Sequence, residues 1–477
     1  MRLAFIAMGM VLFGHSFCLA NDGLKVGYFD VDASPPIGSP MAYDITTEVL
    51  SPLHCRGIVI LGSDAPIVLC AVDWIEIANE GHQFFREELG RAAATPVERV
   101  SVHCLHQHDA PWCDFTADKL AEEQGIRREM FDSAFARDVI QRAAKAVQSA
   151  MIQAAPVTHV GLGQAEVEQV ASNRRILGPD GKVKAVRYTA TKDPALQAAP
   201  EGVIDPMLKS IAFWNGEHRI VELTYYATHP QSYYRTGKAN PDFPGMARDQ
   251  RQQVTGVPHV HFNGAGGNIG AGKYNDGRPE MRAVLMDRVA NGMTRAWESE
   301  RKVPIAKMDV DWKVARVVLP PSPHLQHEQL VEQLNNKQRT SRERVIAACK
   351  LAWLLRCERG NEIDIGCLSL GDVRVLHLPG ELFVEYQLLS QAVRPDLFVT
   401  MAAYGDCGPW YIGTEIAYQQ GGYETSPSSS LVAPHVEQVL VDAIKTLLDA
   451  NEIPTERLGI DAARHEVEAA KLENQSK

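Results

Sequence analysis

The sequence predicts an α+β fold of mixed α/β character, in which one large domain of mixed sheets is packed with helices. Two observations lead to this prediction. Strand-like runs come in neighbouring pairs joined by short turns, and helix-like stretches separate these pairs at irregular intervals. A regular βα barrel would instead alternate strands and helices strictly. We find no internal repeat and no low-complexity linker in the sequence, so a single domain is expected.

The first third of the chain begins with a predicted hairpin. The apolar runs "RGIVILGS" at 56–63 and "PIVLCAVD" at 66–73 predict two strands, and the short "SDAP" turn joins them. Residues 77–92 carry apolar side chains at helical spacing, and "VERVSVHCL" at 97–105 is again strand-like. A further helix is expected near 130–151.

The middle of the chain adds strands and a long helix. Strands are expected near 157–165 and 183–189, and "RIVELTYYAT" at 219–228 predicts a strand that runs directly into a His-Pro pair. Residues 278–300 have a helical pattern, whereas "MDVDWKVARVVL" at 308–319 is extended.

The last third contains the longest expected helix, at 324–356. The strands "IDIGCLSL" at 363–370 and "VRVLHLP" at 373–379 follow, and a helix is expected to begin directly after them at Gly380-Glu381. The remaining strong elements are a strand at 396–404 and a helix at 431–451.

Composition and charge restrict the possible partners. The chain has 477 residues, 45% of them hydrophobic and 22% charged, which is typical of a globular protein with a large core. There are 59 Asp and Glu against 48 Lys and Arg, and the formal net charge is -11. Nucleic acid is therefore not an expected partner. We expect a small-molecule or lipid-like substrate, while the oligomeric state stays open.

Residues 1–20, "MRLAFIAMGMVLFGHSFCLA", have the features of a secretory signal peptide. One early charge precedes an apolar stretch too short to anchor the chain in a membrane, and Cys18 and Ala20 give a small-x-small ending. No other segment is expected to be transmembrane. The expected organisation is a signal peptide at 1–20, one folded domain at 21–455 and a polar tail at 456–477. The expected location is secreted or periplasmic.

The stretch "CLHQHDAPWC" at 104–113 contains the first candidate metal ligands. His106 and His108 follow a strand-like run at spacing i, i+2, so their side chains would point to one face. Such a pair can serve one metal ion, or one histidine can bind it while the other carries protons. A structural zinc site closed by Cys104 and Cys113 is less favoured, because no second cluster completes it. An ordinary histidine pair remains an alternative.

Three further metal-capable side chains lie at the ends of predicted strands. His229 ends "TYYATHP", Glu381 ends "VLHLPGE" and Tyr411 lies in "GPWYIGTEIAY". Catalytic zinc sites draw single ligands from distant segments in this way and keep one coordination position open. Taken singly, each residue also has an ordinary structural explanation. His229 would be a satisfied turn histidine, Glu381 a helix N-terminal acid and Tyr411 a packed aromatic.

Six short motifs, in order along the chain, resemble the catalytic domain of the neutral/alkaline, non-lysosomal ceramidase family. They are "HQHDAP", "ATHP", "DFPG", "FNGAGGNIG", "LPGE" and "YIGTEIAY…GGYE". The resemblance extends from about residue 25 to 450 and implies the ceramidase fold with one Zn2+ per chain. The ligands that it implies are His106, His229, Glu381 and Tyr411, with His108 beside the metal as a proton-handling group. Water activated by zinc would then attack a scissile carbonyl.

Several positions depart from the family pattern. The family segment G-D-x-S-P, whose serine assists catalysis, aligns with Gly267-Asn268-Ile269-Gly270-Ala271, so glycine replaces the serine and asparagine the aspartate. The Ser-Gly that follows HxH in the family is Asp109-Ala110 here, and the chain has no room for the family's C-terminal immunoglobulin-like domain. We therefore expect an exported zinc-dependent hydrolase of amide or related bonds with an undetermined substrate, ceramide itself being doubtful.

Two groups of residues are candidates for catalytic roles beyond metal binding. Asp109 could orient His108 or take a proton from bound water, the alternative being a solvated turn acid. Gly267, Asn268 and Gly270 belong to a glycine-rich loop whose backbone N–H groups could face a substrate oxyanion. A plain tight turn is the alternative for this loop.

Other features leave further alternatives open. His259 and His261 share a strand face and could hold a second metal, although strand histidines satisfied by their neighbours are more common. Asp73 ends a strand, where it could be a site residue or could only support nearby loops, and Glu424 could lie behind the metal ligands. Two other functions remain possible, a binuclear amidohydrolase-like barrel enzyme and a non-catalytic metal-containing binding protein of the same fold.

Overall fold

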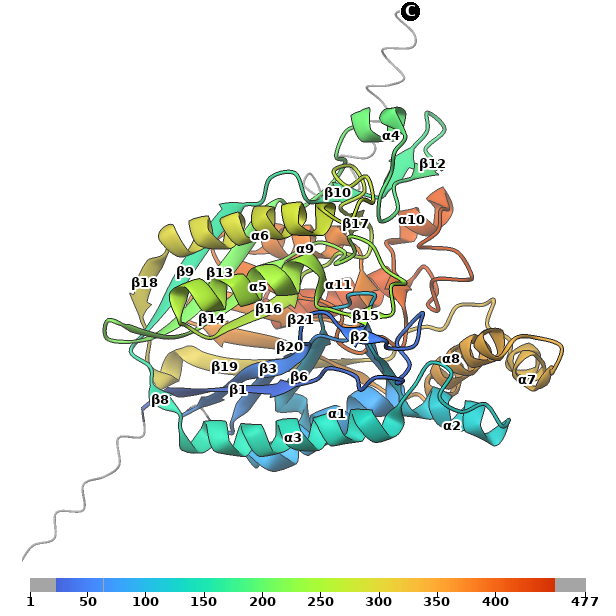
Figure 1. Ribbon diagram of the computed structural model, residues 1–477. Coiled ribbons are helices and arrows are strands. Elements are labelled where there is room, and N and C mark those ends of the chain that lie inside the picture. The colour runs from blue at the N-terminus through green and yellow to red at the C-terminus, as the bar shows by residue number, and fades with distance from the viewer. Residues whose placement is uncertain (1–22, 63, 451–477) are drawn as a thin grey trace, which may run out of the picture.

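The computed structural model describes residues 23–62 and 64–450 (Figure 1). The predicted signal peptide at 1–20 and the polar tail at 456–477 lie outside the described residues. None of the helices in the described ranges has the length and apolar character needed to cross a membrane.

The first sheet contains the predicted hairpin and has the strand order β6-β4-β3-β1-β8. Its strands β1, β3 and β4 are antiparallel, whereas β6 pairs with β4 in parallel. Helices α1 and α3 cover its outer face (Figure 1). The elements are β1 (Lys25–Asp32), β3 (His54–Leu61), β4 (Ile67–Val72), α1 (Asn79–Ala93), β6 (Val100–Cys104), α3 (Ser133–Ile152) and β8 (Ala155–Pro156).

The second sheet has the order β16-β14-β13-β9-β18. Its strands β9, β13 and β14 are antiparallel, and β16 pairs with β14 in parallel. Helices α5 and α6 cover its outer face (Figure 1). The elements are β9 (His159–Glu166), β13 (Met207–Asn215), β14 (His218–Tyr226), α5 (Asp242–Thr255), β16 (His259–Asn263), α6 (Met281–Glu298) and β18 (Arg301–Pro304).

The third sheet has the order β19-β20-β21-β23. Again three strands are antiparallel, and the last, β23, pairs with β21 in parallel. Helices α9 and α11 pack against it. The elements are β19 (Val310–Val317), β20 (Ile363–Leu370), β21 (Val373–His377), α9 (Val384–Val393), β23 (Phe398–Ala402) and α11 (Val436–Leu447).

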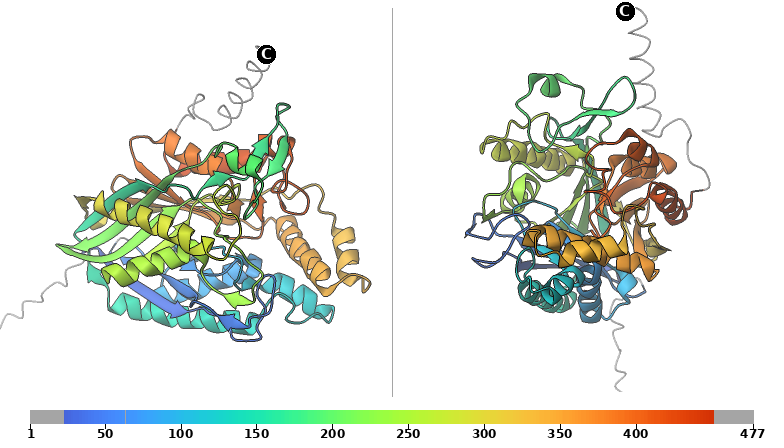
Figure 2. Two further views of the ribbon diagram at one scale, coloured as in Figure 1. Left: turned by 45° about the horizontal axis from the view of Figure 1, so that its top comes forward. Right: turned by 90° about the vertical axis from the view of Figure 1, so that its right-hand side faces the viewer.

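The three sheets are therefore three copies of one topology. Each has three antiparallel strands, a helix, a fourth strand parallel to the third, and a further covering helix. The blue, green-yellow and orange-red parts of the chain surround a common centre in the right-hand view of Figure 2. The sequence-based expectation of no internal repeat is wrong at this level. The copies share an order of helices and strands. Different apolar residues can specify the same strands as long as they alternate with a period of two, so the copies need not be similar in sequence.

The inner faces of the three sheets pack on one another and form a common core. Fully buried examples are Ile58 and Leu69 from the first sheet, Phe213 from the second, and Leu368 and Val375 from the third. Burying each large apolar side chain contributes roughly 1.5–3 kcal/mol. The mutual packing of the sheets fixes the positions of the loops at their ends.

Two expected helices differ from the structure. The expected helix at 324–356 is two helices, α7 (His327–Asn335) and α8 (Ser341–Glu358). The break occurs because the Thr340 side chain accepts the Glu343 N–H while Glu343 binds the Thr340 N–H, a capping box that starts a new helix. The helix expected at Gly380 begins only at Val384, after a short strand. The other predicted helices and strands are confirmed, with shifted ends.

Short elements complete the described part of the chain. Two-stranded pairs at the sheet ends, β5 with β7 and β22 with β24, are both parallel. The short elements are β2 (Glu48–Val49), β5 (Glu76–Ala78), η1 (Val97–Arg99), β7 (Trp112–Asp114), α2 (Phe115–Glu123), β10 (Ser172–Asn173), β11 (Arg175–Leu177), β12 (Val183–Val186), α4 (Pro194–Ala198), β15 (Lys238–Ala239), β17 (Ile269–Gly270), η2 (Lys307–Asp309), β22 (Glu381–Leu382), β24 (Tyr411–Ile412) and α10 (Glu415–Gln420).

Candidate metal centre and active site

The candidate ligands are brought together where strands of the three sheets end. His106 follows β6 by two residues, His229 follows β14 by three, and Glu381 opens β22 directly after β21. Their side chains are 2%, 2% and 4% exposed. One sheet therefore supplies each of these three side chains to a single buried cluster.

His106 is held by backbone contacts on one side of its ring. Its N–H donates to the Trp74 carbonyl at 2.9 Å, and its Nδ1 lies 2.7 Å from the Ile75 carbonyl. A carbonyl can only accept, so Nδ1 carries the proton and the lone pair of neutral His106 is on Nε2. This Nε2 lies 3.0 Å from Glu381 Oε2. The His106 backbone has a φ of 68°, a left-handed conformation that occurs at functional sites.

Two more imidazoles complete the cluster. His229 Nε2 lies 3.4 Å from His108 Nε2, and His229 Nδ1 lies 3.8 Å from Glu381 Oε2. His108 Nδ1, His229 Nδ1 and Glu381 Oε2 are all buried without a hydrogen-bond partner. Burial lowers the pKa of His108 and of His229 well below its usual value, and the neighbouring His106 and Arg174 lower both further. Both rings are therefore neutral at pH 7, with lone pairs available.

A second carboxylate, which the sequence analysis missed, lies at the same place. Glu76 opens β5 after β4, as Glu381 opens β22 after β21, and it is 6% exposed. Ligand atoms of Glu76, His106 and Glu381 lie within 4.8 Å of one another, as do those of His106, His108 and His229. The signal in the sequence was the position of Glu76 shortly after a predicted strand.

Tyr411 lies beside this cluster. The parallel pairing of β22 with β24 sets Tyr411 directly across from Glu381, and its ring is stacked on His229 at 6.3 Å and 5°. Its hydroxyl oxygen accepts a hydrogen bond from Arg174 Nη1 at 3.2 Å. Burial raises the pKa of Tyr411 well above its usual value, and the Glu381 carboxylate adds to this, whereas Arg174 opposes it.

Arg174 is a second residue that sequence reasoning missed. It is 5% exposed, and its Nε lies 3.3 Å from Glu424 Oε1. A small pocket reaches the cluster at this point, and its lining residues include Arg174, Tyr188, His229, Gln231 and Gly270. A substrate carbonyl in this pocket would meet a guanidinium next to the candidate ligands. No motif marks Arg174 in the sequence, because its role depends on a contact with Tyr411.

Comparisons with known proteins identify the fold. No protein-family model and no curated protein matches the chain. The solved structure of the neutral ceramidase from Pseudomonas aeruginosa is similar, with a TM-score of 0.65, 16% identity, and coverage of 91% of this chain and 76% of that chain. The chain has the fold of the neutral ceramidases. A structure described as a ceramidase complexed with C2 gives a TM-score of 0.64 at 15% identity, covering 91% of this chain and 77% of that one.

The comparison confirms two expectations from the sequence, the mixed α/β fold class and the resemblance to neutral ceramidases. At 15% and 16% identity the likeness concerns the fold. The strand–helix barrel required by the amidohydrolase alternative is wrong, because the three large sheets within residues 23–62 and 64–450 are mainly antiparallel.

The glycine-rich loop at 267–270 does not have the oxyanion-binding role that was expected for all of its candidate residues. The Gly267 N–H donates to the Leu382 carbonyl at 2.8 Å, so it is not free to bind an oxyanion. The Asn268 side chain accepts the Val384 N–H at 2.9 Å and donates to Glu385 at 2.9 Å, which holds the start of α9. Both residues support the backbone that carries Glu381, whereas Gly270 alone lines the pocket.

Asp109 contacts the loop after His229 instead of the expected partner, His108. Its carboxylate accepts the Arg235 N–H at 2.9 Å, and the N–H and hydroxyl of Thr236 at 3.3 and 2.7 Å. His108 Nδ1 has no partner, so the expected bond from Asp109 to His108 is absent. The carboxylate instead fixes the loop after His229.

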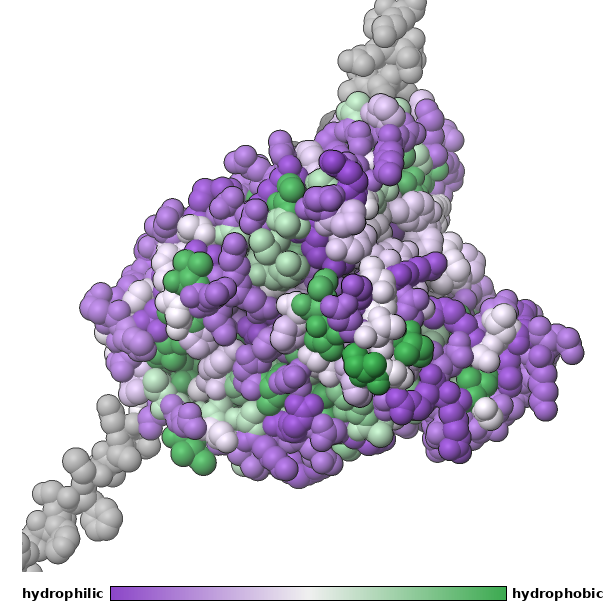
Figure 3. Space-filling view, in the orientation of Figure 1, coloured by the Kyte–Doolittle hydropathy of each residue, from purple (hydrophilic) through white to green (hydrophobic). Residues whose placement is uncertain are grey.

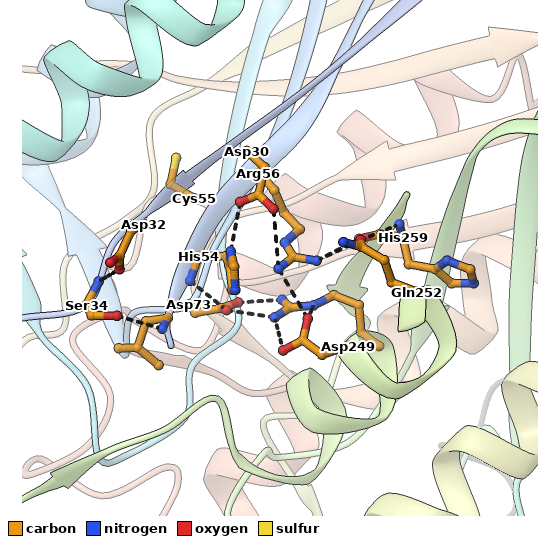
Figure 4. A network of polar contacts seen from close by, with 12 residues as sticks. Asp30, Asp32, Ser34, His54, Cys55, Arg56, Asp73, Asp249, Gln252 and His259 are labelled. Carbon is orange, nitrogen blue, oxygen red and sulfur yellow. Dashed lines mark hydrogen bonds and ion pairs between the residues drawn. The ribbon is translucent and has the colours of Figure 1, made fainter. Parts of the chain in front are cut away.

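The other histidine and acid candidates lie outside the cluster. His259 Nδ1 lies 2.8 Å from the Val257 carbonyl and His261 Nδ1 2.9 Å from the Thr224 hydroxyl, whereas His261 Nε2 is buried without a hydrogen-bond partner. Asp73 binds Arg248 within a polar network between the first sheet and α5 (Figure 4). Glu424 forms an ion pair with Arg174, which in turn donates a hydrogen bond to Tyr411.

Two glycines of the loop provide a matched prediction. A Cβ at Gly267 would lie 2.3 Å from the Glu381 carbonyl oxygen, whereas a Cβ at Gly270 would meet nothing closer than 3.5 Å. We expect Gly267→Ala to lower the free energy of unfolding by about 3 kcal/mol and Gly270→Ala to change it by less than about 1 kcal/mol. Urea unfolding measures both. Equal effects would contradict the close approach of Gly267 to the strand that carries Glu381.

The residues present fit a bound metal ion. His106 Nε2 lies 3.0 Å from Glu381 Oε2, a spacing at which a proton or a cation must lie between the two atoms. The unpartnered His229 and Glu381 atoms meet at the same place. Imidazole nitrogen and carboxylate oxygen are also the donors that zinc takes in catalytic sites.

Proposed function

We propose that this protein is a zinc-dependent hydrolase of the neutral ceramidase type that cleaves an amide or a related carbonyl bond. One observation carries the proposal: ligand atoms of His106, His108 and His229 lie within 4.8 Å of one another, as do those of Glu76, His106 and Glu381, and His229 Nδ1 and Glu381 Oε2 are buried without a hydrogen-bond partner. With Tyr411 beside them, these residues would hold one Zn2+ per chain. The resemblance of the surrounding motifs to the neutral ceramidase family supports the same assignment, since it implies that these four residues are zinc ligands.

The ion would supply Lewis-acid activation of water and of the scissile carbonyl. The side chains of the protein would orient the ligands, bind the carbonyl oxygen and carry protons. His106 is kept in one tautomer by the Ile75 carbonyl, which directs its Nε2 lone pair into the cluster. Arg174, which donates a hydrogen bond to the Tyr411 hydroxyl, lies next to His229 and can bind a carbonyl oxygen as negative charge develops on it. His108 has an unpartnered Nδ1 and is the residue suited to carry protons.

The surface next to the site supports a substrate with an apolar part. The segment between β1 and β3 carries Tyr43, whose ring stacks on His108 at 5.8 Å. The same segment has three exposed large apolar side chains, Ile37, Ile45 and Leu50. On the face shown in Figure 3, apolar residues form separate patches within a mainly hydrophilic surface. We propose a lipid-like or other partly apolar amide as substrate, with ceramide doubtful because glycine occupies the position of the family serine.

We also propose that the protein is exported, to the periplasm or outside the cell. The support is the sequence of residues 1–20, with its early charge, apolar stretch and small-x-small ending. In this organisation, residues 21–455 are the catalytic domain.

Metal content and turnover of the purified chain test the proposal. We expect about one zinc per chain, hydrolysis of at least one member of a panel of acyl amides, and loss of that activity on chelation with recovery on adding zinc. Two metals per chain would favour a binuclear enzyme. A metal-replete protein that hydrolyses no amide, ester or lactone would favour a binding protein of the same fold.

A further inference from the structure

Two arginine side chains lie against one tyrosine ring beside the candidate metal centre. The guanidinium carbon of Arg235 is 5.1 Å from the centroid of the Tyr43 ring, and that of Arg342 is 5.2 Å from it. Arg235 is exposed and belongs to the loop after His229, whereas Arg342 is partly exposed in the first turn of α8. The fold therefore brings two solvent-accessible cations from distant segments to one ring.

Neither of these guanidinium groups has a carboxylate partner. Within residues 23–62 and 64–450, no ion pair within 4.0 Å involves Arg235 or Arg342, although acidic residues outnumber basic ones in the chain. The nearby Arg339, in contrast, lies 3.8 Å from Glu343. Like charges around one ring repel each other, and an anion that both can contact removes this repulsion.

The Tyr43 ring, which both arginines contact, also packs against the histidine cluster. Tyr43 stacks on His108 with parallel planes at 5.8 Å, and Tyr234 contacts both rings. His108 Nε2 in turn lies 3.4 Å from His229 Nε2. The Tyr43 ring thus lies between the two cations and the histidine cluster.

We infer that the substrate is an amide that bears a carboxylate, and that Arg235 and Arg342 bind this carboxylate while the scissile carbonyl lies at the cluster of His106, His229 and Glu381. The inference rests on the proposed hydrolase function and narrows its substrate class. The carboxylate has two possible sources. An N-acyl amino acid carries it on the amine half, and a monoamide of a dicarboxylic acid carries it on the acyl half.

Pairs of charged and neutral probes test this inference on the zinc-loaded protein. N-benzoylglycine and its neutral amide represent a charge on the amine half, and succinic acid monoanilide and its neutral amide represent a charge on the acyl half. Affinity is measured by titration calorimetry, or as KM for any probe that is hydrolysed. We expect the charged member of one pair to bind at least tenfold more tightly than its neutral partner, and that pair identifies the half that carries the charge.

Variants test whether the tighter binding of the charged probe depends on Arg235 and Arg342. Arg342→Gln keeps a good helix former in an accessible position, and we expect it to weaken binding of the charged probe about tenfold without changing the neutral one. Arg235→Gln is expected to do the same. Arg339→Gln, the matched control in the turn before α8, should change neither. Equal affinity within both pairs, no binding of any probe, or an equal loss in the control would overturn the inference. The binding data remain informative without amide hydrolysis, so failure of the proposed function is distinguishable.

Discussion

Replacing His106 with alanine is expected to remove the bound zinc and to lower amide hydrolysis at least about a thousandfold. The ring directs its Nε2 into the cluster, 3.0 Å from Glu381 Oε2, and the remaining side chains cannot close the coordination shell without it. A metal ion contributes several kcal/mol of transition-state stabilisation, and about 4 kcal/mol corresponds to a thousandfold change in rate. Zinc per chain by elemental analysis and kcat on the best amide measure the two effects.

Glu381→Gln separates loss of the metal from loss of the fold. The substitution keeps the shape of the side chain, and Glu381 Oε2 has no hydrogen bond to lose. We expect loss of zinc and activity with a cooperative unfolding transition retained. His218→Ala, a change of an exposed histidine at the first position of β14, is the control and should keep full zinc content. Stoichiometric zinc in both His106→Ala and Glu381→Gln would refute the ligand assignment.

Replacing Asp73 with alanine is expected to lower the free energy of unfolding by about 3–5 kcal/mol. Both Asp73 oxygens bind Arg248, at 2.6 and 2.8 Å, and both side chains are 0% exposed (Figure 4). One oxygen also accepts the His54 N–H at 2.9 Å. Removal of the carboxylate leaves a buried guanidinium with only Asp249, a partly exposed partner.

Urea unfolding at several pH values measures both the loss of stability in Asp73→Ala and its pH dependence. Burial raises the pKa of Asp73, but the Arg248 guanidinium outweighs this and holds the pKa below its usual value. The unfolded chain therefore binds a proton more readily, so the stabilisation is present above about pH 4 and is lost as the pH falls further. Asp276→Ala, which removes an exposed pair with Arg278, should cost less than about 1 kcal/mol. A similarly small cost at Asp73 would contradict the prediction.

The pattern of the sequence was sufficient for most strands and for the approximate order of helices, but β1 and β13 were not predicted. Elements were missed where local chemistry hides the pattern. Helix α5 carries Pro244 and Gly245 in its first turn, which weakens a helical signal although proline is tolerated there. The break between α7 and α8 depends on a capping box centred on Thr340, within a stretch that otherwise has helical spacing.

The site could be predicted only where a residue's partners are implied by a motif. His106, His229, Glu381 and Tyr411 lie close together, because each follows or opens a strand and the strands end at one place. The contacts of Asp109 could not be foreseen, since its partner Thr236 lies far along the chain. Gly267 and Asn268 were likewise taken for substrate contacts although their hydrogen bonds hold the strand of Glu381 and the helix after it.

The three sheets contribute the candidate ligands in chain order, from His106 to Tyr411. The centre is therefore incomplete until the chain has been synthesised beyond Tyr411 and the third sheet has docked against the other two. A nascent chain offers only isolated histidines, which bind metal weakly. If the chain crosses a membrane unfolded, the metal that it acquires is set by the ions available in the compartment where folding finishes.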